Sequence, residues 1–323
     1  MKNSFYGNIN GKEVKKHTLT NGKMEADIIT YGATLTALRV NKDKKVINTV
    51  LGYDSLEDYQ NGTAYYGAII GRFGNRIQNA SFVLNGKEYK VGANEGKNSL
   101  HGGFKGFDKQ IWSAKPISDN CLELSYLSVD GEEGFPGNLN VTVTYSITDD
   151  NALSIEYSAV SDADTVINLT NHAYFNTNGI EDTVEGLKLQ ILADKITPVG
   201  KDLIPHGDFR EVLGTRFDFR TPREFICDLS AEPILKDRGC FDENFVLNGS
   251  GERLVATLFS EKTGLNMEVY TDQAGLQIYT DNKYGIALET QNFPNAVNCS
   301  EYPSAILRKG EEYHTVTKYK FKL

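Results

Sequence analysis

Apolar and polar residues alternate along much of this 323-residue chain, which is the pattern of β-strands with one buried face. The clearest run is 139–147, where apolar side chains take every second position. The same period continues in 153–157, after a turn at 149–151, and it also occurs at 122–126. We therefore expect these three segments to form an antiparallel meander with one face buried and one face wet.

Further strands are expected in both flanking regions, at 26–40, 267–271, 276–280 and 313–321. Segment 81–90 predicts a hairpin, because Asn85-Gly86 suits a type I′ turn. Helical turns are expected only near 55–59 and 221–229.

The predicted strands do not alternate with helices, so nothing in the pattern indicates a parallel sheet. The chain has no internal repeat and no linker rich in Pro, Gly and Ser, which makes two separate β domains the weaker interpretation. The pattern predicts an all-β fold: one large antiparallel β-sandwich with few short helices, formed by residues 1–323 as a single domain.

Segment 166–176 combines an apolar face with an unusual polar face. As a strand, it would point Ile167, Leu169, Ala173 and Phe175 to one side, and Asn168, Thr170, His172, Tyr174 and Asn176 to the other. The polar face carries no Lys, Arg, Asp or Glu, so we interpret it as a surface for a neutral polar ligand such as a sugar. A polar outer face with an incidental histidine is the alternative.

Two glycine-containing segments also gather polar groups. Segment 71–77 places Arg72 and Arg76 between glycines, and by itself it fits a surface loop with solvated arginines. Segment 98–104 sets His101 before two glycines, which fits a tight turn but also allows close approach to a ligand.

Acidic residues occur beside two strand-like runs. Asp242 and Glu243 precede one run, where a charged pair is most often solvated. Glu289 lies within the alternating segment 286–291, on the side opposite Ile286 and Leu288. A carboxylate at such a position needs a reason, because an unpaired buried charge is costly.

Composition restricts the partners. Charged residues are 24% and apolar residues 40% of the chain, as in an ordinary globular protein, and the net charge of -9 argues against a nucleic-acid partner. The N-terminus has no signal-peptide core and no apolar run could cross a bilayer, so we expect a cytoplasmic protein without a membrane partner. The scattered Cys121, Cys227, Cys240 and Cys299 are interpreted as reduced thiols.

Motifs for other chemistry are missing. The sequence has no His-Glu-x-x-His or Cys/His cluster for a metal and no Gly-x-Ser-x-Gly elbow for a hydrolase. The glycine spacing at 71–77 does not fit a nucleotide fingerprint either. We therefore expect no metal and no cofactor.

Together, these segments resemble the aldose 1-epimerases, or galactose mutarotases. The resemblance rests on Gly-Arg-Phe-Gly-Asn-Arg-Ile at 71–77, Asn-Ser-Leu-His-Gly-Gly at 98–103, Asp-Gly-Glu-Glu-Gly-Phe-Pro-Gly at 130–137, Asn-Leu-Thr-Asn-His-Ala-Tyr-Phe-Asn at 168–176 and Glu-Thr-Gln-Asn-Phe-Pro at 289–294. Shorter matches lie at 106–109, 241–242 and 276–280, so that the resemblance covers essentially the whole chain.

The resemblance implies a β-supersandwich and interconversion of the α- and β-anomers of free aldohexoses such as galactose and glucose. It also implies that Glu289 is the general base and His172 the general acid. The residues that match sugar contacts are Asn75, Arg76, His101, Tyr174, Asp242 and Gln277. Ala173 departs from the family pattern, since a small hydroxyl residue is common there.

Such a reaction needs a base for the C1 hydroxyl proton and an acid for the ring oxygen. We expect Glu289 to be ionised at neutral pH, and we expect Asp242 to favour the charged form of His172. Trp112, Phe73 and Phe293 could stack on a sugar, although core packing is the default for each.

Three other functions stay open from the sequence. A hexose-6-phosphate 1-epimerase would need additional cations for the phosphate. A glycoside hydrolase would use Glu289 and Asp242. A non-catalytic sugar-binding β-sandwich would not need an acid–base pair. The sequence leaves the preferred aldose open, as well as the choice between a monomer and a homodimer.

Overall fold

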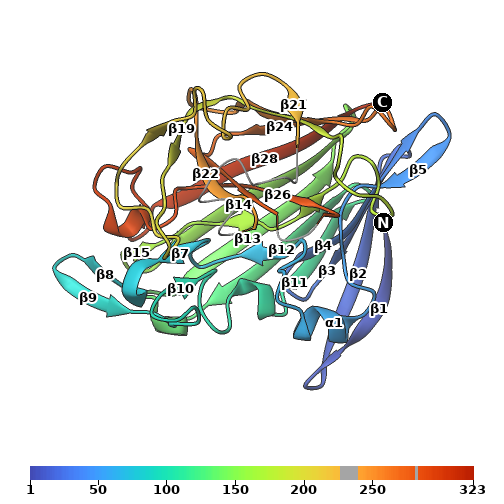
Figure 1. The fold of residues 1–323 in the computed structure, drawn as a ribbon. Coiled ribbons are helices and arrows are strands. Elements are labelled where there is room, and N and C mark those ends of the chain that lie inside the picture. The colour runs from blue at the N-terminus through green and yellow to red at the C-terminus, as the bar shows by residue number, and fades with distance from the viewer. Residues whose placement is uncertain (226–238, 281–282) are drawn as a thin grey trace.

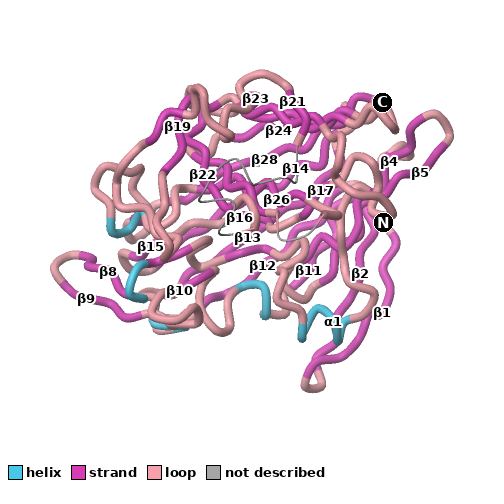
Figure 2. The backbone as a smooth tube through the Cα atoms, viewed as in Figure 1, coloured by secondary structure: helices cyan, strands magenta, loops and turns pink. Residues whose placement is uncertain are grey.

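The computed structural model describes residues 1–225, 239–280 and 283–323, and it consists mainly of antiparallel β-strands (Figure 1 and Figure 2). The largest sheet has nine strands in the order β11 (Ser113–Ser118), β12 (Cys121–Ser128), β13 (Leu139–Ile147), β14 (Ala152–Ser161), β28 (Glu312–Lys322), β24 (Asn266–Thr271), β23 (Arg253–Phe259), β18 (Lys188–Ile191) and β21 (Arg223–Glu224).

Two further sheets accompany it. The six-stranded sheet has the order β17 (Tyr174–Phe175), β26 (Ile286–Gln291), β25 (Gly275–Tyr279), β22 (Asp242–Leu247), β19 (Ala193–Thr197) and β20 (Arg210–Glu211). The five-stranded sheet contains β1 (Lys2–Ile9), β2 (Lys12–Thr20), β3 (Met24–Ile29), β4 (Thr34–Lys42) and β5 (Lys45–Asn48). The predicted all-β, antiparallel sandwich is confirmed.

Short elements connect the sheets. Four two-stranded pairs are β6 (Ile69–Ile70) with β16 (Thr170–Asn171), β7 (Arg76–Ile77) with β10 (Ser99–Leu100), β8 (Ser81–Leu84) with β9 (Lys87–Lys90), and β15 (Thr165–Val166) with β27 (Ile306–Leu307). The helical segments are α1 (Leu56–Asn61), η1 (Gln78–Ala80), η2 (Phe107–Lys109), η3 (Glu132–Gly134) and η4 (Ala296–Asn298). None of the helices in the described ranges is long and apolar enough to cross a membrane.

The main core lies between the nine-stranded sheet and the two smaller sheets. Strand β13 alternates buried apolar residues with more exposed polar ones, as its sequence predicts. The hydroxyl of Tyr319 in β28 donates to the backbone oxygen of Leu288 in β26 (3.0 Å), which joins two of the layers. Burying an aliphatic side chain in such a core is worth about 1.5–3 kcal/mol, so the alternating pattern drives the layers together.

The predicted meander is confirmed as β12, β13 and β14, which pair in sequence order. Figure 1 shows β13, β14 and β28 running through the middle of the molecule, and β14 lies between the other two. The predicted hairpin is β8–β9, and the positive φ angles of Asn85 (52°) and Gly86 (78°) fit the type I′ turn.

Segment 166–176 is not the continuous strand that the alternation predicts. It breaks into β15, β16 and the start of the six-stranded sheet, β17, and each piece pairs with a different partner. The predicted apolar face is still correct, because Ile167, Leu169, Ala173 and Phe175 all lie in the main core. Periodicity therefore identified the two faces but not the change of partner.

The helical turn near 55–59 is present as α1, whose N-cap Ser55 accepts a hydrogen bond from Asp58 N (3.2 Å). The turn expected at 221–229 is wrong where it is described, because Arg223–Glu224 forms β21 beside β18. Residues 226–229, including Cys227, lie outside the described ranges. Among the described cysteines, Cys121 and Cys299 are free thiols.

Candidate active site

A cavity of about 380 Å³ opens over the polar face of the six-stranded sheet. That volume is within the range of small-molecule sites. The predicted site residues His172, Glu289, Asn75, Arg76, His101, Tyr174 and Asp242 all line it. Gln277 does not, and its place is described below.

Strand pairing explains why the sheet residues share one face. Gln277 in β25 lies opposite Glu289 in β26, and Tyr279, two residues on, lies opposite Asp242 in β22. Tyr174 in β17 pairs with Ala287, two residues before Glu289, and therefore points to the same side. Ile286 and Leu288 point the other way, into the core.

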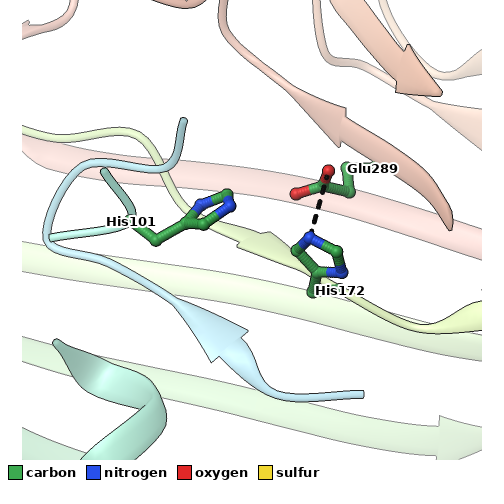
Figure 3. A group of neighbouring side chains, drawn as sticks. All are labelled: His101, His172 and Glu289. Carbon is green, nitrogen blue, oxygen red and sulfur yellow. Dashed lines mark ion pairs between the residues drawn. The ribbon is translucent and has the colours of Figure 1, made fainter. Parts of the chain in front are cut away.

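Glu289 and His172 face each other inside the cavity, as Figure 3 shows. The distance from His172 Nε2 to Glu289 Oε1 is 3.6 Å, and the side chains are 4% and 2% exposed. Burial raises the pKa of Glu289 well above its ordinary value, with Asp242 adding to the effect and Arg76 opposing it. Burial thus disfavours the ionised form of Glu289 that we expected at neutral pH.

His172 is enclosed by aromatic rings. Its ring stacks on Tyr174, with centroids 5.2 Å apart, and on Tyr65 at 5.8 Å. Burial lowers the pKa of His172 to about 4. We expected Asp242 to favour the charged imidazole, but desolvation by burial outweighs any such attraction and favours the neutral ring at neutral pH.

His101 presents a fixed tautomer. Its Nδ1 accepts a hydrogen bond from the backbone N–H of Asn75 (3.1 Å), so the proton of the neutral ring belongs on Nε2. Burial lowers the pKa of His101 well below its ordinary value, and His172 and Arg76 lower it further. His101 thus offers one neutral N–H donor, with its ring centroid 5.2 Å from that of His172.

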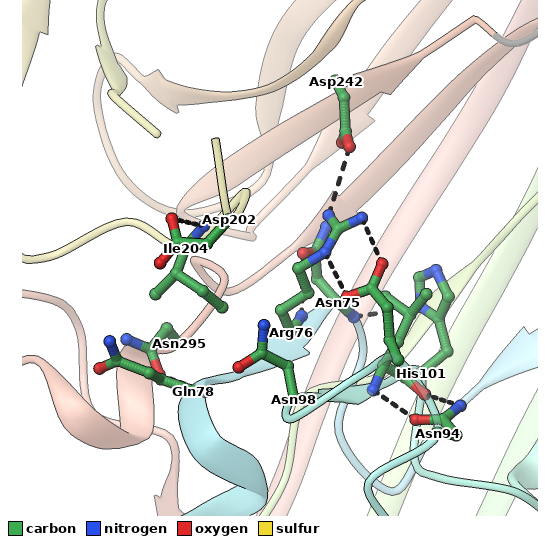
Figure 4. Close-up of polar contacts among 12 residues, drawn as sticks. Asn75, Arg76, Gln78, Asn94, Asn98, His101, Asp202, Ile204, Asp242 and Asn295 are labelled. Carbon is green, nitrogen blue, oxygen red and sulfur yellow. Dashed lines mark hydrogen bonds and ion pairs between the residues drawn. The ribbon is translucent and has the colours of Figure 1, made fainter. Parts of the chain in front are cut away.

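Arg76 is clamped between two carboxylates (Figure 4). Its Nε and Nη2 donate to Glu95 at 2.8 Å each, and its Nη1 donates to Asp242 Oδ2 at 3.3 Å. The side chain is buried, so the interpretation of segment 71–77 as a loop with solvated arginines is wrong. A bidentate clamp fixes the plane of the guanidinium and hence the direction of its remaining N–H groups.

Asp242 and Glu243 are buried rather than solvated, which corrects the interpretation of a solvated pair. Asp242 Oδ1 accepts a hydrogen bond from Gln277 Nε2 at 2.5 Å. Gln277 thus lies beside Asp242 and is not among the residues that line the cavity, and its contact with the sugar stays a prediction.

Arg72 lies apart from the cavity and is also buried. Its Nη1 donates to the backbone oxygens of Pro136 (2.7 Å) and Gly137 (3.0 Å), and its Nη2 donates to Ser128 Oγ (2.6 Å). The aromatic residues Trp112, Phe73 and Phe293 pack in the cores, as their default interpretation predicts.

Donor atoms of His101, His172 and Glu289 lie within 4.8 Å of one another, close enough to suggest a metal site. The hydrogen bonding of His101 does not fit one. A histidine that binds metal through Nε2 normally donates Nδ1–H to an acceptor, whereas Nδ1 of His101 accepts from a backbone N–H. The group is better suited to proton transfer and hydrogen bonding.

Sequence reasoning missed several residues of the cavity wall, among them Tyr65, Glu95 and Tyr279. Glu95 lies in a turn in which its backbone N–H and that of Asn98 each donate to the other's oxygen (3.1 and 2.9 Å). An acidic residue in a polar turn gives no sequence signal of such a partner. Tyr279 could have been found from its register with Asp242, because it lies in a predicted strand.

Comparison with known proteins supports these observations. The sequence profile of the family "Aldose 1-epimerase" matches residues 15–320. The chain is 41% identical over 327 residues to a galactose mutarotase of Bos taurus, covering 95% of this chain and 94% of that protein. It is 37% identical over 321 residues to an aldose 1-epimerase of Escherichia coli K12, covering 93% of each.

Among solved structures, a galactose 1-epimerase from Lactobacillus acidophilus NCFM superposes with a TM-score of 0.89 at 27% identity. The alignment covers 99% of this chain and 98% of that one. The structural similarity therefore extends over essentially the whole chain.

Proposed function

The chain belongs to the aldose 1-epimerase family, and we propose that it interconverts the α- and β-anomers of free aldohexoses such as galactose and glucose, with Glu289 and His172 as the acid–base pair. The enzyme is then an isomerase that acts on carbohydrates, with residues 1–323 working as one catalytic unit. A cytoplasmic setting, where free hexoses are metabolised, fits this activity. The observation that carries the assignment of roles is the carboxylate–imidazole pair, 3.6 Å apart in a shared cavity.

The proposed reaction has two symmetrical halves. The step starts from the charged form of the pair, with Glu289 ionised and both ring nitrogens of His172 protonated. Glu289 takes the proton of the C1 hydroxyl while His172 gives one of its two ring protons to the ring oxygen, and the C1–O5 bond breaks. The aldehyde turns about C1–C2, and the same two residues reverse their roles as the ring closes on the other face. General acid–base assistance of this kind is worth about 10²–10⁴-fold per group.

The pKa directions concern the relative stability of the two protonation forms of this pair. Burial disfavours the charges of both residues and thus favours a protonated Glu289 beside a neutral His172. That is the arrangement reached once the ring has opened, because Glu289 has by then gained a proton and His172 has lost one. Burial therefore helps the opening step to proceed from the less stable charged pair.

Polar groups around the pair are suited to hold the sugar. The Nε2–H of His101 and the clamped guanidinium of Arg76 supply donors in fixed directions. Asp242 supplies acceptor oxygens, oriented by Gln277. Such preorganised groups cost little reorganisation when charge develops on the ring oxygen.

Mutarotation is tested by polarimetry with freshly dissolved α-D-galactose and α-D-glucose. We expect the wild type to speed the change in optical rotation, and Glu289→Gln to lower kcat by at least about 100-fold while still binding sugar. Glu261→Gln, which changes an exposed carboxylate, is the matched control and should act like the wild type. A Glu289→Gln variant with normal turnover would end the proposed role of this residue.

The charged residues of the cavity distinguish an epimerase of free hexoses from a hexose-6-phosphate 1-epimerase. Among the described lining residues, Arg76 is the one Lys or Arg, and Glu95 and Asp242 already engage it. An anionic phosphate would face these carboxylates, so we expect glucose to be a better substrate than glucose 6-phosphate. Binding of galactose without faster mutarotation would instead support the non-catalytic sugar-binding function.

A further inference from the structure

Segment 130–137 is part of the family resemblance, yet none of its residues lines the cavity that the described chain forms. We propose that Glu133, in η3 of this segment, is a positioning residue for His101. It holds the turn that carries His101 and thereby fixes the direction of the Nε2–H donor in the cavity. The inference rests on the proposed function in that His101 is taken to contact the sugar.

The carboxylate of Glu133 caps the backbone of the turn that follows His101. Its Oε2 accepts from the N–H of Phe104 (2.9 Å), and its Oε1 accepts from the N–H of Lys105 (3.0 Å). The backbone oxygen of Glu133 accepts from Gly92 N–H (2.9 Å), which attaches η3 to the neighbouring chain. One carboxylate thus accepts hydrogen bonds from two consecutive backbone amides, those of Phe104 and Lys105, which lie outside any helix or strand.

The space for this carboxylate exists because two residues lack a side chain. A Cβ built on Gly92 or on Gly103 would lie 2.3 Å from Glu133 Oε2. Any larger residue at either position would displace the carboxylate from the amides. The glycines of the His101 turn therefore serve the Glu133 contact as well as the fold of the turn.

The turn itself needs to be held. His101, Gly102 and Gly103 have φ angles of 53°, 88° and 102°, so three consecutive residues adopt positive φ, which is unfavourable for the histidine. On the other side of the turn, Asn94 Nδ2 donates to the backbone oxygens of Leu100 and Gly103 at 2.9 Å each. Asn94 and Glu133 thus hold the turn from two sides.

The position of the turn determines what His101 presents. His101 N–H donates to Asn75 O, and Asn75 N–H donates to His101 Nδ1, both at 3.1 Å. If the turn shifts, the second of these bonds is lost, and with it the constraint that keeps the ring proton on Nε2. Loss of the Glu133 contact is therefore expected to make the Nε2–H donor of His101 less well ordered, without removing any residue that lines the cavity.

Glu132 provides a matched control in the same short helix. Its Oε2 accepts from Ser128 Oγ (2.5 Å), and its Oε1 accepts from Tyr126 OH, with no contact to the amides of residues 104 and 105. Glu132→Gln changes a carboxylate of the same η3, but it leaves the cap on the turn in place.

The kinetic test compares Glu133→Gln with Glu132→Gln in the mutarotation assay. A glutamine accepts one of the two amide hydrogens but turns an NH2 group toward the other, so we expect kcat/KM to fall roughly tenfold. Glu132→Gln should stay within about twofold of the wild type. Glu133→Asp, which keeps the charge on a shorter side chain, should show a smaller loss and serves if Glu133→Gln does not fold.

A double-mutant cycle separates positioning from general damage. If Glu133 acts through His101, adding Glu133→Gln to His101→Asn should lower kcat/KM by no more than about twofold further. A full tenfold loss in the His101→Asn background, or an equal loss in Glu132→Gln, would overturn the proposal.

Nitrogen-15 NMR of the His101 ring tests the same point without activity. The wild type and Glu132→Gln should show the Nε2–H tautomer, and Glu133→Gln should show a mixture. An unchanged His101 tautomer in Glu133→Gln would contradict the proposed positioning role of Glu133. If the wild type accelerates no mutarotation, the proposed function fails, but this spectrum still decides whether Glu133 positions His101.

Discussion

At the scale of single residues, Glu289 shows a conflict between stability and activity. Its side chain is 2% exposed, and burial and Asp242 together raise its pKa. A group whose pKa is raised by folding binds its proton more tightly in the folded state. Its stabilising contribution is present below the pKa of the unfolded chain and is lost as the pH rises through the folded pKa. At alkaline pH, Glu289 therefore destabilises the protein that it serves.

We predict that Glu289→Gln raises the free energy of unfolding at pH 8 by about 1 kcal/mol while removing activity, because a neutral amide of the same shape avoids the buried charge. The gain should be smaller at pH 5. Urea denaturation at both pH values measures it. A variant less stable than the wild type at pH 8 would show that the carboxylate is net stabilising there.

At the scale of elements, Arg72 joins segments that are distant in sequence. It reaches from the end of β6 to the end of β12, to the 136–137 turn and to β15, where Nη1 donates to Thr165 Oγ1 at 3.2 Å. Burial lowers the pKa of Arg72 to about 10, so the group still carries its charge at neutral pH. A buried cation is tolerated here because its planar fork meets several oxygens at once.

We predict that Arg72→Lys lowers the free energy of unfolding by roughly 3 kcal/mol, since one ammonium cannot replace the fork and leaves oxygens unsatisfied. Chemical denaturation measures the loss. Arg308→Lys, at an arginine that is 49% exposed and paired with Asp164, is the control and should change stability by less than about 1 kcal/mol. Equal effects of the two substitutions would contradict the bridging role.

At the scale of the whole molecule, three buried histidines make the fold sensitive to acid. His17, His101 and His172 are each buried, and burial lowers the pKa of each below its ordinary value. At these three side chains, the unfolded chain therefore binds more protons than the folded protein below about pH 6.5. Their contribution to stability falls as the pH drops from there toward the folded pKa values.

We predict a progressive loss of stability between pH 6.5 and pH 4, of which His172, with its pKa near 4, contributes roughly 3 kcal/mol. Denaturation curves across this range measure it. His172→Asn removes one titrating group and should flatten the dependence by up to about 1.4 kcal/mol per pH unit. An unchanged slope in this variant would contradict a neutral buried His172.

Periodicity in the sequence determined the fold class and much of its detail. Alternation in 139–147 and the Asn85-Gly86 turn each encode their structure locally, because a strand's facing and a hairpin's turn depend on neighbours in the chain. The same local rule marked the polar faces that carry His172 and Glu289. The ordered motifs indicated the family, and through that resemblance seven of the residues that line the cavity.

Tertiary structure alone decided how those faces meet. The break of 166–176 into three strands, the clamp of Glu95 on Arg76 and the burial of Arg72 depend on partners far away in sequence. So do the lowered pKa of His172 and the raised pKa of Glu289, because desolvation is a property of the surrounding volume. A chain encodes which side chains point the same way, whereas only packing determines how dry their shared space becomes.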